Sequence, residues 1–322
     1  MMSILGGAAI ISPRAVTAQT SAKASRLGTL SPGMPIAEAS FQGKALLGAL
    51  AQRGYTLGRN LTYIARASGG QKAKLPALVE EFKASGIDAL VVMGYPTALA
   101  AKGSGIPTVV AFGAGDPVAT GLIDSLARPG GNITGISDVA TTLSIKRLSL
   151  LKELSPKLAR VAMLWNRDDL AMSLRYDASA KAAQSMGITV QALGVREPDD
   201  FSGVFEAMDR EPPEAILMVS DSLTTLNRKR VFDYAAARRL PAIYEYDFLV
   251  REGGLMSYGS DLTESFERAA ALVDRIFKGA QPSDLPFEQP TRYPFVINLK
   301  TAKALALEIP STLLARADEM IE

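Results

Sequence analysis

The chain has 322 residues, 48% of them hydrophobic, and its 35 basic and 33 acidic residues leave a formal net charge of +2. This length and composition predict two domains of ordinary size, and the balanced charge, without a basic stripe that alternates with aromatics, argues against a nucleic-acid partner. The sequence contains neither Cys nor His, which excludes disulfides, thiol nucleophiles, His-dependent catalytic triads and His-ligated metals.

Residues 1–19 differ from the rest of the chain. A short apolar run, Ile4 to Ile11, precedes Ser12-Pro13-Arg14 and a small-residue stretch that ends at Gln19. This order indicates a signal peptide over residues 1–19, because the run is too short to span a membrane. The alternative is a buried N-terminal strand, for which the Gly-Gly-Ala-Ala centre is poorly suited. We expect an exported, soluble protein with no membrane span of its own.

The first half of the chain alternates predicted strands and helices. In chain order they are a strand at 26–30, a helix at 41–53, a strand at 61–67, a helix at 75–84, a strand at 89–93, a helix at 98–102 and a strand at 106–112. A loop follows at Gly113-Ala114-Gly115. Asp116 and Pro117 then predict the start of a helix that stops at Arg128, and a short strand at 132–137 leaves this half.

The same pattern then begins again. The predicted elements are a helix at 143–154, a strand at 160–165, a helix at 173–186, a strand at 189–195, a helix at 199–210, a strand at 215–219, a helix at 226–239 and a strand at 241–246. The tail adds a strand at 254–258, a helix at 262–278, a Pro-rich connection at 281–290, a strand at 293–299 and helices at 301–307 and 311–321.

This order of elements predicts an α/β fold of two Rossmann-like lobes, because strands that alternate with helices form parallel sheets covered on both faces. Lobe one would comprise 25–135 plus 257–288, and lobe two 136–256 plus 289–322. The segments 132–137, 254–259 and 287–291 are expected to cross between the lobes as a three-segment hinge. The cleft between the lobes is then the expected ligand site.

Four long stretches of the sequence resemble a known family. They are GDPVATGLIDSLARPGGNITGIS at 115–137 and the segments 146–166, 253–259 and 297–322. In these stretches the chain resembles the substrate-binding proteins of bacterial ABC importers, in the group described as tryptophan/tyrosine transport binding proteins. The resemblance implies a type I periplasmic-binding fold. It also implies an exported, periplasmic receptor that hands a small organic ligand, an amino acid or an aromatic or carboxylate compound, to a membrane permease and its ATPase.

Ligand contacts are expected in the loops that follow strands facing the cleft. The carboxylate of a zwitterion needs hydrogen-bond donors, which helix N-termini supply. The candidates in lobe one are Ser31, Gly94, Tyr95, Thr97, Ala114, Gly115 and Asp116. Thr97 fits an ordinary helix cap equally well. Asp116 fits a cap better than a ligand group, which leaves the free amides of Ala114 and Gly115 as the more plausible anion site.

The candidates in lobe two are Asn166, Asp221, Ser222, Tyr244 and Tyr246. Asp221 directly follows a buried strand and is the best candidate to bind a ligand ammonium, with helix capping as the alternative. Asn166 fits a bond to the ligand or to its own loop. The rings of Tyr244 and Tyr246, and of Tyr95 in lobe one, fit an aromatic ligand wall or ordinary packing. We expect no catalytic residue, no metal and no cofactor.

Three other functions compete with an importer receptor. A transcription regulator on this fold needs an N-terminal DNA-binding unit, which residues 1–25 are too short to supply. An enzyme would have to work with Asp, Lys or Tyr, and no close carboxylate pair stands out. A sensor for a membrane signalling partner fits the sequence as well as import does.

The expected partners are the small ligand, the permease and its ATPase, and the receptor itself is expected to be a monomer. The basic residues at 228–230 and 238–239 predict a solvated helix face, with a permease docking surface as the alternative. No Walker motif is present, so the chain is not the ATPase.

Overall fold

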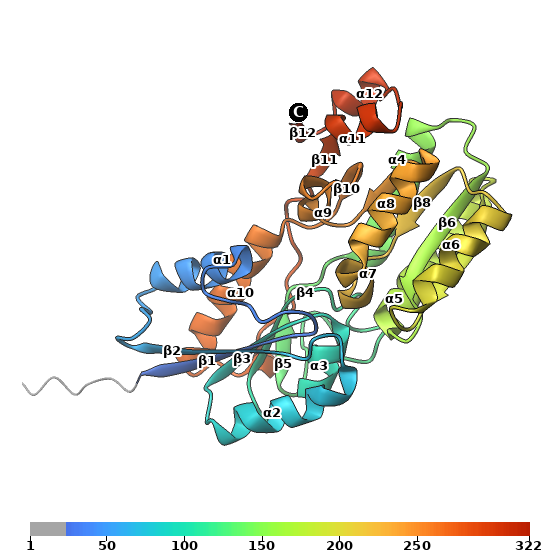
Figure 1. Ribbon diagram of the computed structural model, residues 1–322. Helices are drawn as coiled ribbons and strands as arrows, with labels where there is room; N and C mark the ends of the chain where they lie inside the picture. Colours follow the sequence, from blue (N-terminus) through green and yellow to red (C-terminus); the bar gives the residue numbers. More distant parts are fainter. Residues whose placement is uncertain (1–23) are drawn as a thin grey trace, which may run out of the picture.

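The computed structural model describes residues 24–322, and of residues 140 and 141 only the backbone. The chain forms two α/β lobes, each built on one sheet (Figure 1). This confirms the predicted fold class. The predicted signal peptide, residues 1–19, lies outside the described residues.

The first lobe contains a parallel five-stranded sheet in the order β2-β1-β3-β4-β5. Its strands are β1 Ser25–Ser31, β2 Leu61–Ala67, β3 Ala89–Met93, β4 Thr108–Phe112 and β5 Ile133–Gly135. Its helices are α1 Phe41–Ala51, η1 Lys72–Lys74, α2 Leu75–Ala84, α3 Tyr95–Ala101, α10 Leu262–Phe277 and η2 Pro282–Asp284.

Helices cover both faces of this sheet. Val91 packs in the core beneath α1 and α10, whereas its neighbours Leu90 and Val92 pack in the core beneath α2 and α3. Successive residues of a strand point to opposite faces, so a strand buried on both sides is a continuous apolar run. In Figure 1, α10 (orange) lies beside α1 (blue), although the two are far apart in the sequence.

The second lobe contains a seven-stranded sheet in the order β12-β11-β10-β9-β8-β6-β7. Its strands are β6 Arg160–Asn166, β7 Thr189–Val195, β8 Ala215–Met218, β9 Ala242–Tyr244, β10 Met256–Tyr258, β11 Phe295–Asn298 and β12 Glu319–Ile321. Its helices are α4 Ala140–Leu154, α5 Leu170–Ser185, α6 Asp200–Arg210, α7 Ser222–Leu226, α8 Arg228–Arg238, α9 Asp247–Arg251, α11 Leu299–Ala304 and α12 Ser311–Leu314.

The chain passes between the two sheets three times, at residues 136–139, 259–261 and 288–294, which we call the crossing segments. They lie side by side: the Ser137 N–H donates to the Glu288 carbonyl at 2.8 Å, and the Ser260 hydroxyl donates to the Asp138 carbonyl at 3.4 Å. The three-segment connection predicted from the sequence is confirmed. The exact lobe boundaries stay a prediction, except that residues 257 and 258 pair in the second sheet.

The helix predicted to start at Asp116 is wrong. Residues 116–128 form a series of turns instead. Asp116 caps the first turn, since its Oδ1 accepts from the N–H groups of Val118 and Ala119 at 3.0 Å. Gly121 then adopts a φ of 68°, which ends the turn in the left-handed conformation that glycine favours.

Two further predictions are wrong near the C-terminus. The helix predicted at 311–321 ends at Leu314, and 319–321 form β12, because these residues pair with the exposed edge of β11. The Asp318 carboxylate fixes this turn by accepting from the Phe295 N–H at 2.7 Å. The sheet is also not wholly parallel, because β10 and β11 are antiparallel. The strand predicted at 241–246 is shorter, with α9 following it. The helix predicted at 226–239 corresponds to α8, and the short helix α7 before it was not predicted.

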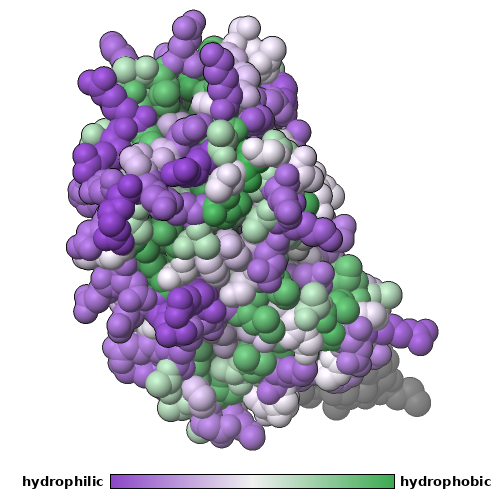
Figure 2. All heavy atoms as spheres, turned by 90° about the vertical axis from the view of Figure 1, so that its right-hand side faces the viewer, coloured by the Kyte–Doolittle hydropathy of each residue, from purple (hydrophilic) through white to green (hydrophobic). Residues whose placement is uncertain are grey.

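No helix among residues 24–322 has the length and apolar character needed to cross a membrane. On the face shown in Figure 2, hydrophilic side chains dominate and apolar ones appear in separate patches. Scattered apolar patches of this kind are ordinary for a protein surface.

Gly259 lies where a crossing segment passes over the end of β9. A Cβ atom at this position would lie 2.0 Å from the backbone carbonyl oxygen of Glu245. The main chain would therefore have to shift to make room for it. We expect Gly259→Ala to lower the free energy of unfolding by about 1–3 kcal/mol, measured by urea denaturation. Gly48→Ala is the control, because a Cβ there meets open space on α1. A loss in the control equal to that at Gly259 would contradict the steric account.

Candidate functional site

A cavity of about 380 Å³ lies between the two lobes. The first lobe lines it with the loops after β1, β3 and β4 and with the start of α1, and the second lobe lines it from α5, α7, α8 and α9 and the strand ends beside them. The full lining is Ser31–Ile36, Ser40, Gln42, Met93, Gly94, Pro96, Phe112, Gly113, Asp169, Ser220–Ser222, Thr225, Leu226, Arg228, Tyr246, Phe248 and Glu252. Carboxyl ends of parallel strands meet at one edge of a sheet, which is where open α/β folds bind ligands.

Two buried carboxylates of the second lobe, Asp169 and Asp221, lie in the cavity wall. Asp221 begins α7 with a capping box, accepting from the Thr224 N–H at 2.9 Å on one oxygen and from the Asn166 amide at 2.5 Å on the other. Asp169 caps α5 by accepting from the N–H groups of Ala171 and Met172 at 2.9 and 3.3 Å, both on Oδ1. The buried hydroxyl of Ser220, beside Asp221, has no hydrogen-bond partner among residues 24–322. This acidic end of the cavity therefore keeps unused hydrogen-bonding capacity.

Burial makes these carboxylates costly to ionise. Desolvation raises the pKa of Asp169 to about 6, the nearby charge of Asp221 adds to the effect, and Lys72 opposes it. Desolvation also raises the pKa of Asp221, against the hydrogen bonds from Thr224 and Asn166, which favour its carboxylate form. A cation that enters the cavity would offset both penalties.

Aromatic rings form another part of the wall. The Tyr246 ring stacks with Phe248 at a centroid distance of 6.0 Å and meets the edge of Phe112, from the first lobe, at 5.5 Å. Met34 and Leu226 also line the cavity and are 71% and 47% exposed, so they lie at its open side. The cavity therefore combines an acidic end with an aromatic and aliphatic wall.

The lobes contact each other around this cavity. Lys72 of the first lobe donates from Nζ to the Asp168 carbonyl of the second at 3.0 Å. Gly115 approaches α5 so closely that a Cβ would lie 2.8 Å from the Cβ of Ala171, and its φ is 71°. Glycine is required here on both grounds. These contacts define a closed arrangement of the two lobes.

Five of the sequence-derived candidates line this cavity, and seven do not. Those in the lining are Ser31, Gly94, Asp221, Ser222 and Tyr246. Those outside it are Tyr95, Thr97, Ala114, Gly115, Asp116, Asn166 and Tyr244.

The candidates outside the lining have other contacts. The Thr97 hydroxyl donates to backbone carbonyls of residues 93 and 94, at 2.5 and 2.9 Å. The side chains of Ala114 and Tyr244 are in the hydrophobic cores. The Tyr95 hydroxyl lies 3.5 Å from the Thr120 carbonyl. Asn166 reaches the cavity only through its hydrogen bond to Asp221.

Several lining residues were missed in the sequence. Asp169 is the N-cap residue of α5, but the helix predicted from the sequence began only at residue 173, so this cap was overlooked. Gln42, Phe248 and Glu252 lie on or beside helices, and the faces that these helices turn to the cavity depend on tertiary packing. Arg228 belongs to the basic cluster predicted as a solvated helix face, yet it lines the cavity while its Nε donates to Glu252.

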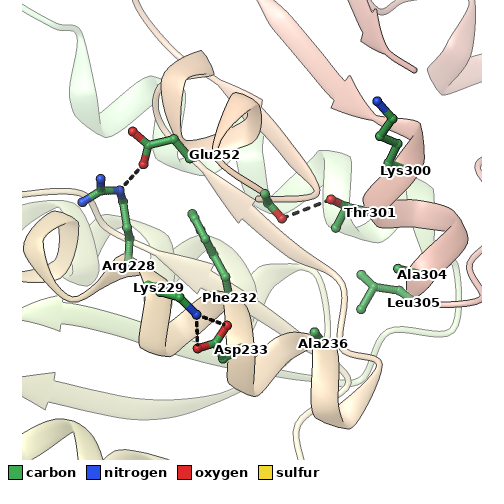
Figure 3. A pocket seen from close by; sticks show the side chains of 11 residues that line it. Arg228, Lys229, Phe232, Asp233, Ala236, Glu252, Lys300, Thr301, Ala304 and Leu305 are labelled. Atoms are coloured by element: carbon green, nitrogen blue, oxygen red, sulfur yellow. Dashed lines mark hydrogen bonds and ion pairs between the residues drawn. The ribbon is translucent and has the colours of Figure 1, made fainter.

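A larger hollow of about 570 Å³ lies on the second lobe alone, between α8 and α11 (Figure 3). Arg228 and Glu252 separate it from the cavity, since they line both. Its other charged groups include Lys229, which pairs with Asp233 at 2.7 Å on the surface (Figure 3). No described residue of the first lobe lines it, so closure of the lobes would not enclose a ligand there. The cavity between the lobes is the better candidate site.

Two α/β lobes, joined by three crossing segments and enclosing a cavity between them, define a receptor for a small solute with the type I periplasmic-binding fold. Residues 38–321 match the family of ABC transporter substrate binding proteins, and the chain belongs to that family. The protein is therefore a substrate-binding receptor, as the sequence resemblance implies.

Three relatives illustrate the similarity. The chain is 25% identical over 268 residues, 82% of this chain and 76% of that protein, to a tyrosine-binding protein of Clostridioides difficile (strain R20291). Its fold is similar to an ABC domain from Streptococcus pneumonia solved with L-Trp, with a TM-score of 0.84 and 23% identity over 93% of this chain and 100% of that one. It is also similar to a conserved domain protein from Vibrio cholerae, with a TM-score of 0.85 and 24% identity over 92% and 100% of the two chains.

Proposed function

We propose that this receptor captures an α-amino acid with an aromatic or other apolar side chain, by closure of its two lobes. The observation that carries the proposal is the pairing, in one cavity, of the buried carboxylates Asp169 and Asp221 with the rings of Phe112, Tyr246 and Phe248. In this proposal Asp221 binds the ligand ammonium, with the Ser220 hydroxyl accepting a second hydrogen bond from it. The rings pack against the ligand side chain.

Two of the similar proteins support an amino-acid ligand. One is a tyrosine-binding protein, and the other was solved with L-Trp bound. The charges of the cavity add an independent argument. Of the described residues that line the cavity, Arg228 is the one with a cationic side chain, and Glu252 already pairs with it, so the acidic end dominates recognition. We infer that the ammonium group contributes more to affinity than the carboxylate does.

Calorimetric titration with four related compounds tests this proposal. L-tryptophan has both charged groups, tryptamine lacks the carboxylate, indole-3-propionate lacks the ammonium, and glycine lacks the aromatic body. We expect saturable binding of L-tryptophan, weaker but measurable binding of tryptamine, and no binding of the other two at the same concentrations. Binding of indole-3-propionate equal to that of L-tryptophan would contradict the role of the carboxylates.

We also propose that the protein works outside the cytoplasm as a monomer and delivers its ligand to an ABC permease with its ATPase. The family membership supports this role. Native mass spectrometry of the purified mature protein would detect both a co-purified ligand and the oligomeric state.

Ligand affinity should depend on pH through Asp169. Its pKa in the folded protein is about 6, above the ordinary 3.8. The neutral carboxyl therefore stabilises the folded, ligand-free protein fully below about pH 4, and this stabilisation is lost as the pH rises through 6. An ammonium ligand prefers the ionised form. We therefore expect affinity to increase about tenfold between pH 5 and pH 7, since about one tenth of such groups are ionised at pH 5. Calorimetry across this range is the measurement.

Asp169→Asn keeps a residue that can cap α5 but cannot ionise. It should bind more weakly at neutral pH and with a flatter pH profile. An unchanged profile in this variant would remove Asp169 as the titrating group.

A further inference from the structure

Four charged side chains are buried together where the crossing segments meet the second lobe. Asp138 follows β5, Arg147 lies in α4, Arg175 in α5 and Glu245 after β9, and none is more than 5% exposed. One Glu245 oxygen accepts from Arg147 at 2.9 Å and the other accepts from Arg175 at 2.8 Å. Arg175 also donates to Asp138. These four residues, which we call the buried quartet, form one continuous chain of ion pairs.

The buried quartet binds two of the three crossing segments. Asp138 itself belongs to the first segment. Arg147 Nη1 donates to the carbonyl of Tyr258, directly before the second segment, at 2.8 Å, and Ser260 in that segment donates to the carbonyl of Asp138. Buried ion pairs are often no more stabilising than apolar groups of similar volume, and they are best attested as devices that fix one arrangement. The position of the quartet therefore points to control of geometry at the connection.

The buried quartet also lies directly behind the wall of the ligand cavity. Tyr246, which follows Glu245 in the chain, lines both the cavity and a small void of about 10 Å³ that all four members of the quartet line. The ring of Tyr246 also contacts the ring of Phe112 in the first lobe. A continuous series of contacts thus leads from the interface of the closed lobes, through Tyr246, to the crossing segments.

The first lobe holds the third crossing segment separately. Glu264, in the first turn of α10, accepts from the N–H groups of Thr291 and Arg292 at 3.0 and 2.9 Å and from the Thr291 hydroxyl at 2.7 Å. Arg268 in the same helix pairs with Glu288 at 2.8 Å. Each lobe therefore fixes a different part of the connection, and a change of angle between the lobes must occur between these two attachments.

We propose that the buried quartet sets the angle between the lobes, so that Asp138 and Arg147 are positioning residues for ligand binding although neither lines the ligand cavity. The inference rests on the proposed function, because the angle affects affinity through closure around the ligand. When the quartet is broken, the crossing segments are held less tightly and the closed population falls. The apparent dissociation constant then rises in the same proportion.

The test measures the distance between the lobes directly. The chain contains no cysteine, so Ala84→Cys on α2 and Lys181→Cys on α5 provide two unique, exposed sites for spin labels. The distance distribution is recorded with and without L-tryptophan in the otherwise unaltered protein, in Asp138→Asn and in Arg147→Lys. We expect both variants to broaden or shift the ligand-free distribution and to weaken L-tryptophan binding at least fivefold.

One control variant and three further outcomes complete the test. Asp209→Asn breaks an exposed ion pair with Arg238 on the outer face and should change neither distance nor affinity. If Asp138→Asn does not fold, the charge-conserving Arg147→Lys still decides the question. Lower melting temperatures with unaltered distances and affinity would show a merely structural role and overturn the proposal. If the unaltered protein does not bind L-tryptophan, the amino-acid assignment fails, whereas the ligand-free distances still test the buried quartet.

Discussion

Replacing Glu245 by alanine should lower the free energy of unfolding by about 3–5 kcal/mol, the range expected when one partner of a buried ion pair is removed. Glu245 is 3% exposed and accepts from both Arg147 and Arg175. Without it, both buried guanidinium groups lose the carboxylate that they share, and Asp138 pairs with Arg175 but not with Arg147. Urea denaturation, followed by circular dichroism, measures the loss.

Glu153→Ala is the matched control for this change. Glu153 also pairs with an arginine, Arg316, but both side chains are partly exposed, at 37% and 43%. Exposed pairs typically contribute about 0–1 kcal/mol, so the control should lose little stability. Equal losses at Glu153 and Glu245 would contradict the importance of burial.

Asp221→Asn should weaken binding of an amino-acid ligand by about 1.5–3 kcal/mol, which corresponds to about 10- to 150-fold in the dissociation constant. Asparagine has nearly the same shape as aspartate and can still cap α7. The change therefore removes the negative charge that we assign to the ammonium group, while the capping box is largely retained. Calorimetric titration of the folded variant measures the effect.

Asp116→Asn is the corresponding control. Asp116 also caps its following turn, but it lies outside the cavity lining. Its replacement should leave ligand affinity unaltered. A folded Asp221→Asn variant with unaltered affinity would remove Asp221 from the proposed site.

Most strands could be predicted from the sequence because each is short, apolar and bounded by turn residues. β3 and β8 are continuous apolar runs, as strands buried on both faces must be. The failures occurred where long-range contacts decide the structure. The residues at 319–321 have a helical pattern, but β11 offers them an unpaired sheet edge. Likewise, the sequence predicted a helix from Asp116, but Gly121 adopts the left-handed conformation and residues 116–128 form turns.

The site was predictable in part for the same reason. Residues that directly follow strands, such as Ser31, Gly94 and Asp221, reach the cavity because the sheet topology places them at its edge. The direction of a side chain within such a loop is not fixed by that rule. Thr97 turns its hydroxyl back to the main chain, and Tyr244 packs against Phe232 inside the second lobe. The buried quartet gave no local signal, since its members are spread over more than 100 residues of sequence.

The crystal structure of the protein grown with L-tryptophan tests the central claim most directly. Our account predicts the ligand in the cavity between the lobes. Its ammonium nitrogen should lie at hydrogen-bond distance, about 2.7–3.2 Å, from the carboxylate of Asp221, and its ring should pack against Tyr246. A ligand bound instead in the outer hollow beside Phe232 and Leu305, or bound between the lobes with its carboxylate toward Lys72 and no contact to Asp221, would contradict it.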